Sequence, residues 1–142
     1  MNGWESIWDK SVKLCAAGAG ALLSWWTGLG AMPQTLAVFM AADYATGLLC
    51  AWRGVSPKTQ SGTISSKAGF DGLLRKACIV LVVLIASQLD AATGTQAMAA
   101  ATMGFYIANE GISILENTAL LGVPWPQGMK SALEALSKKI DE

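Results

Sequence analysis

The sequence contains no histidine and unusually few charged residues. Charged residues make up 14% of the 142 residues and hydrophobic residues make up 53%, whereas soluble domains usually carry about 25% charged residues. The lack of histidine removes the commonest metal ligand and general base. A formal net charge of zero leaves no electrostatic basis for binding nucleic acid. This composition favours a membrane protein.

Cysteine is also scarce. Cys15, Cys50 and Cys78 lie far apart in apolar stretches, without a CxxC pair or the spacing of a metal site. We expect them to be small, buried apolar residues. The chain shows no nucleophile paired with a base and no glycine-rich phosphate loop of the required form. The sequence therefore predicts neither an enzyme nor a protein that holds a cofactor or a metal.

Long uncharged apolar stretches are present instead. No charged residue occurs in residues 14–42 or in residues 91–109, and such runs are typical of transmembrane helices. We predict an all-α, polytopic membrane protein in which residues 1–142 form a single membrane domain. Its four predicted membrane spans are residues 14–32, 35–52, 73–89 and 97–121.

Both ends of the chain read as amphipathic helices. In residues 1–13, Trp4, Ile7, Trp8 and Val12 share one helical face, which favours a helix lying in the membrane interface. An ordinary packed helix start is the alternative. The tail, residues 127–142, spaces its apolar residues by four, three and four, as a surface or partner-binding helix does: Met129, Leu133, Leu136 and Ile140.

The distribution of basic residues predicts the topology. With four spans, the N-terminus, the polar loop at residues 53–72 and the tail share one side of the membrane. All ten Lys and Arg residues lie on that side or at the span ends that face it, so the positive-inside rule makes that side, and the C-terminus, cytoplasmic. The alternative has three spans and an external N-terminus, with residues 14–32 only dipping into the interface.

Several polar residues lie inside the predicted spans. Asp43 is the deepest charge, and a carboxylate at the centre of a bilayer costs about 2.5–3.5 kcal/mol. In the fourth span, spacings of i, i+4 and i+7 predict a single polar stripe. These residues either line a water-filled pore or join neighbouring helices; the candidates are Asp43, Thr46, Asn109, Glu110, Ser113, Glu116 and Asn117.

Small residues spaced by four mark possible close contacts between helices. The candidates are Ala16, Gly20 and Ser24 in the first span and Ala100, Gly104 and Ala108 in the fourth. Ala and Gly are abundant in both spans, so chance spacing is the alternative explanation.

Three blocks resemble the toxin-secretion/phage-lysis holin family. The first is DYATGLLCAW at residues 43–52, and the second is SSKAGFDGLLRKACIVLVV at residues 65–83. The third is FYIANEGISILENTALLGVPWP at residues 105–126. With the tail, the resemblance covers about residues 36–140. Trp125, between two prolines, is bulkier than the family's usual residue there.

The resemblance implies a function that composition alone does not. Holins are small phage proteins that oligomerise in the bacterial cytoplasmic membrane and form pores, which release a partner endolysin and lyse the host. A holin of this kind is the predicted function, with the lipid bilayer and further copies of the chain as partners. The alternatives are a holin-like protein for toxin export and a small membrane transporter or adaptor subunit.

Overall fold

The protein is all-helical. The computed structural model describes residues 3–28 and 30–141, and over these ranges it holds five helices and no strand. The side chains described within them exclude those of residues 3–6, 22, 23, 25–27, 136, 137 and 139–141. The predicted all-α fold class is therefore confirmed for the described residues.

The chain divides into two compact units, residues 1–34 and residues 35–142. The first unit is mainly α1 (Gly3–Gly28), a single helix that joins the predicted interfacial segment and the first predicted span. Lys13 donates to Asp9 at 2.7 Å, one helical turn away. Ile7, Trp8 and Val12 are exposed, and the side chain of Trp4 lies outside the described residues.

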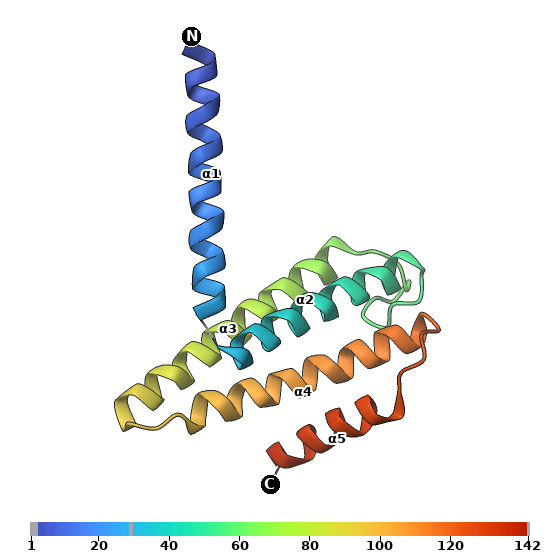
Figure 1. Cartoon of the computed structure of the whole chain (residues 1–142). Coiled ribbons are helices and arrows are strands. Elements are labelled where there is room, and N and C mark those ends of the chain that lie inside the picture. Colours follow the sequence, from blue (N-terminus) through green and yellow to red (C-terminus); the bar gives the residue numbers. More distant parts are fainter. Residues whose placement is uncertain (1–2, 29, 142) are drawn as a thin grey trace. The chain divides into compact units, whose positions relative to one another are not determined.

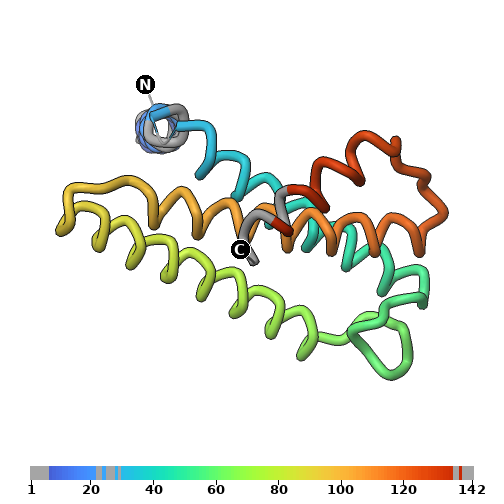
Figure 2. Tube along the Cα trace, turned by 90° about the horizontal axis from the view of Figure 1, so that it is seen from below, coloured from blue at the N-terminus to red at the C-terminus, as the bar shows by residue number. Residues whose placement is uncertain are grey.

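Nearly all of the second unit is helical. Its helices are α2 (Ala31–Trp52), which begins just before the unit boundary, α3 (Ser66–Thr93), α4 (Ala97–Leu120) and α5 (Gln127–Asp141). α2, α3 and α4 lie side by side, and α5 folds back along α4 (Figures 1 and 2). An apolar core joins the first three of these helices through Leu36, Ile79, Met103 and Ile107.

Helix α3 is longer at both ends than the sequence predicts. Ser65 caps its first turn by accepting a hydrogen bond from the Ala68 N–H at 3.4 Å, so the helix begins before residue 73. Its other end extends to Thr93 and stops at Gly94, whose φ of 71° suits glycine. Asp90, just beyond the predicted span at residues 73–89, is helical, and its carboxylate accepts hydrogen bonds from the backbone N–H groups of Met98 and Ala99.

The outer surfaces of α2 and α3 are apolar. Among the described residues, these two helices are long and apolar enough to cross a membrane. α3 alone exposes nine large hydrophobic side chains, as a lipid-facing helix does: Phe70, Leu73, Leu74, Val80, Leu81, Val82, Leu84, Ile85 and Leu89. These features support a membrane location, and the count of four spans stays a prediction.

Candidate functional site

A buried salt bridge joins α2, α3 and α4. Lys76 of α3 donates to Asp43 of α2 at 2.9 Å and also to Glu110 of α4. The three side chains are only 6–14% exposed. We call Asp43, Lys76 and Glu110 the charge network. Removing one partner of such a network leaves a buried charge without compensation, which makes the three helices interdependent.

The charge network lies at one level of the three helices. Asp43 is nine residues before the end of α2 at Trp52, Lys76 ten after the start of α3, and Glu110 ten before the end of α4. At 1.5 Å per residue, each distance along its helix is about 14–15 Å. The alternating direction of the helices thus brings together residues that are far apart in sequence.

Asn117 extends this network toward the end of α4. Its amide donates to the Asp43 carboxylate at 3.2 Å and to the Thr46 hydroxyl at 3.1 Å. Its backbone carbonyl accepts a hydrogen bond from the Cys50 thiol at 3.1 Å. Cys50 is therefore buried as expected, whereas Cys15 and Cys78 are exposed and that part of the expectation is wrong.

A second lysine approaches Asp43 from the loop between α2 and α3. The Lys58 ammonium lies 3.8 Å from the Asp43 carboxylate, and its side chain is half-exposed. The loop is folded on itself, because the Ser56 N–H donates to the Gly62 carbonyl at 3.0 Å. With Lys58 included, the carboxylates of Asp43 and Glu110 lie near two ammonium groups, those of Lys58 and Lys76. The formal charges of these four groups sum to zero.

The predicted polar stripe of α4 divides into two parts. Glu110 and Asn117 are buried, and Ser113 is half-buried beside Asp43. Asn109 and Glu116 are exposed. The reason is geometric, because adjacent helical residues point about 100° apart. When residues 110 and 117 point into the helix unit, residues 109 and 116 point toward its surface. The predicted stripe is therefore part buried and part exposed, and whether its residues line a pore or join helices stays a prediction.

The small-residue candidates also have different surroundings. Gly104 and Ala108 are buried on α4, whereas Ala100 is exposed. In the first unit, Ala16, Gly20 and Ser24 are exposed. Whether these positions bind other copies of the chain stays a prediction.

Sequence reasoning missed Lys76, the centre of the charge network. It counted Lys76 only as a basic residue on the cytoplasmic side. A signal was present, because two carboxylates in apolar helices require a positive partner. Lys76 directly precedes the most apolar run of the chain, Ala77–Ala86, and so could reach inward from the third predicted span.

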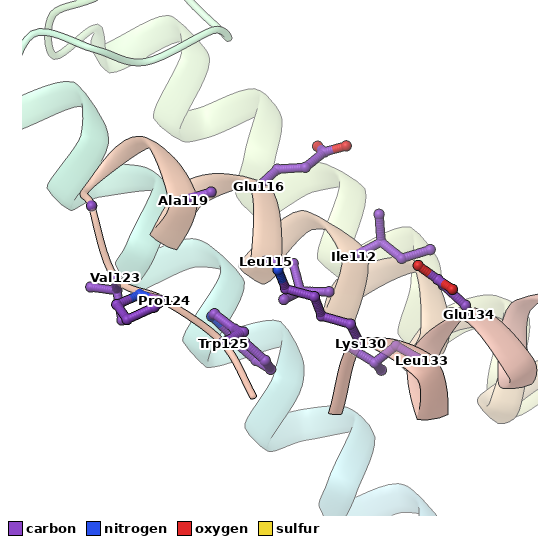
Figure 3. Close-up of a pocket in the computed structure, with 11 residues that line it drawn as sticks. Ile112, Leu115, Glu116, Ala119, Val123, Pro124, Trp125, Lys130, Leu133 and Glu134 are labelled. Carbon is purple, nitrogen blue, oxygen red and sulfur yellow. The ribbon is translucent and has the colours of Figure 1, made fainter. Parts of the chain in front are cut away.

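A groove lies between α4, the connector that follows it and α5 (Figure 3). Its volume is about 680 Å³, and its lining is mostly apolar. In Figure 3 the Glu116 carboxylate points away from Trp125, whose indole N–H donates to the Thr118 hydroxyl at 2.7 Å. The lining residues are Ile112, Leu115, Glu116, Ala119, Gly122, Val123, Pro124, Trp125, Lys130, Leu133 and Glu134.

These features define a class of protein: a small helical membrane protein that turns apolar side chains outward and pairs its charges between helices. Comparison with known proteins identifies the family. The bacteriophage holin family matches residues 20–138, most of the chain. The chain belongs to this family.

Curated relatives agree with the family match. An uncharacterized protein of Clostridium perfringens is 40% identical over 131 residues, covering 90% of this chain and 92% of the relative. A protein of Bacillus phage phi105 described as a probable holin is 33% identical over 101 residues, 70% of each chain. No solved structure matches the chain significantly. The family points to a non-enzymatic membrane protein with a role in phage lysis.

Proposed function

We propose that the chain is a pore-forming holin. Copies of it assemble in the bacterial cytoplasmic membrane and open a pore through which a partner endolysin reaches the cell wall. Family membership and the phage relative described as a probable holin support this function. The family match carries the proposal, and the charge network agrees with it because it joins three largely apolar helices into one unit suited to a membrane.

The proposed topology has four spans and a cytoplasmic C-terminus. α2 and α3 are the better supported spans. α4 is fixed to both by the charge network and therefore shares their depth. The basic residues of the loop and of the start of α5, among them Lys58, Lys67 and Lys130, favour that side as the cytoplasmic one.

The charge network holds the unit together in this proposal, and it does not line the pore. Each carboxylate has a lysine partner, and no buried nitrogen or oxygen of a described side chain lacks a hydrogen-bond partner. Groups paired in this way have their hydrogen bonds within the protein and do not require a water-filled lumen. The lining of the pore must then come from other polar surfaces of the chain.

Induced expression in bacteria tests the function. Cells that express the chain should release a large cytoplasmic enzyme and lose viability, and they should lyse when an endolysin without an export signal is co-expressed. Endolysin alone and the chain alone are the matched controls. If co-expressed endolysin remains inside intact cells although the chain accumulates in the membrane, the proposal is wrong.

A further inference from the structure

Helix α5 packs closely against the middle of α4. A Cβ atom added to Gly111 would lie 2.6 Å from one methyl carbon of Leu133 and 3.1 Å from the other. The same Cβ would lie 3.1 Å from the ring of Phe39 on α2. Leu133 therefore lies in space that Gly111 leaves open, and a larger residue at position 111 would have to displace the Leu133 methyl groups and the Phe39 ring, which marks a close contact between the two helices.

This contact lies well inside the three-helix unit. Gly111 follows Glu110, a member of the charge network, and precedes Leu120, the last residue of α4, by nine positions. That separation is about 14 Å along the helix. α5 runs back from the end of α4 toward this level (Figures 1 and 2). If α4 spans the membrane, α5 lies beside it at membrane depth.

α5 exposes charged side chains around its contact with α4: Glu134 borders the groove between the two helices, and Lys138 lies further round α5 from Leu133. Glu134 and Lys138 are exposed, and Lys138 lies further along α5 than Leu133, hence deeper. Charged side chains at this depth face water or protein, because exposure to lipid is costly. α5 therefore requires water beside Glu134 and Lys138 wherever it remains packed on α4.

We propose that α5 folds back into the membrane and lines the cytoplasmic part of the pore, with Leu133 fixed on Gly111, with Glu134 and Lys138 facing the water, and with the C-terminus in water continuous with the cytoplasm. This inference rests on the proposed pore function. With 15 residues, α5 is about 22 Å long, less than the hydrocarbon thickness of about 30 Å. It therefore lines part of the pore, entering from the cytoplasmic end.

A disulfide between α4 and α5 tests whether α5 stays in place. Gly111→Cys and Leu133→Cys are combined in the full chain with Cys15→Ser and Cys78→Ser, while buried Cys50 is kept. The purified protein is reconstituted in liposomes that contain a fluorescent dextran. We expect the disulfide to form, read from gel mobility, and dextran release to stay within about twofold of the reduced protein. Either failure to form the disulfide or a tenfold loss of release on oxidation would overturn the proposal.

Thiol labelling then tests whether α5 faces the pore. In a background with Cys15→Ser and Cys78→Ser, Glu134→Cys and Lys138→Cys should react with a membrane-impermeant charged reagent and lower the conductance at least twofold. Leu81→Cys on the outer surface of α3 is the matched control and should stay unlabelled. Labelling without a change of conductance would mean that α5 lies in bulk water, which contradicts the proposal. Liposomes in which the unsubstituted protein conducts nothing would refute the pore function itself, whereas disulfide formation separately reports whether α5 packs on α4.

Discussion

Helices α3 and α5 place their charged and apolar side chains on opposite sides. α3 turns Lys76 inward to the charge network and exposes Leu81, Leu84 and other apolar side chains. α5 turns Leu133 inward onto Gly111 and exposes Glu134 and Lys138. From residue 77 to residue 89 the outer surface of α3 carries no charge, which suits lipid, whereas a charged surface requires water. Two helices of one small unit are therefore built for different surroundings.

Removing the inward charge of α3 should have the largest effect. Lys76→Met leaves Asp43 and Glu110 buried without a positive partner on α3, and breaking a buried ion pair in this way costs about 3–5 kcal/mol. We expect the variant to accumulate poorly in membranes and to unfold at a lower temperature in detergent. Membrane accumulation by immunoblot and thermal unfolding of the purified protein measure this.

Arg75→Met is the matched control, because Arg75 is the adjacent basic residue and is exposed. Adding Asp43→Asn and Glu110→Gln to Lys76→Met should restore much of the lost stability, since neutral groups replace the unpaired charges. If Lys76→Met behaves like Arg75→Met, the charge network does not hold the three helices together.

Placing a charge on the outer surface of α3 should have the next largest effect. Leu81 is 58% exposed near the middle of α3, and a lysine at the centre of a membrane helix costs about 2.5–3.5 kcal/mol. Leu81→Lys should therefore lower the fraction of the chain that resists carbonate extraction from membranes. Ala135→Lys, on an exposed position of α5, should leave that fraction unchanged.

The two substitutions add the same side chain, so only the surroundings of the helices differ. Equal losses from both would show that α5 also contacts lipid, and the contrast between the helices would disappear. If both substitutions leave the carbonate-resistant fraction unchanged, α3 does not span the membrane.

Much of the fold could be predicted because residues close together in the sequence decide where a helix forms. The apolar runs and the apolar spacing of the tail located the helices of the second unit to within a few residues, apart from the two ends of α3. Those ends depend on the Ser65 cap and on the interaction of Asp90 with the start of α4. Such contacts do not appear in hydropathy.

The partners within the site could not be predicted in the same way. Sequence spacing identified Asp43, Glu110 and Asn117 as unusual, but it could not show that Lys76 joins the first two, because that pairing requires the arrangement of three helices. The packing of Leu133 on Gly111 was missed for the same reason. A helical period shows which residues share a face, and tertiary structure decides what that face contacts.

Removing Lys58 should have the smallest effect. Its ammonium lies 3.8 Å from Asp43 and its side chain is half-exposed, and exposed ion pairs contribute about 0–1 kcal/mol. Lys58→Met should therefore lower the unfolding temperature in detergent only slightly. High salt should reduce the difference further, because salt screens exposed charges. Lys67→Met, an exposed neighbour at the start of α3, is the control. A loss as large as that of Lys76→Met, unchanged by salt, would instead make Lys58 a full member of the charge network and extend the buried site into the loop.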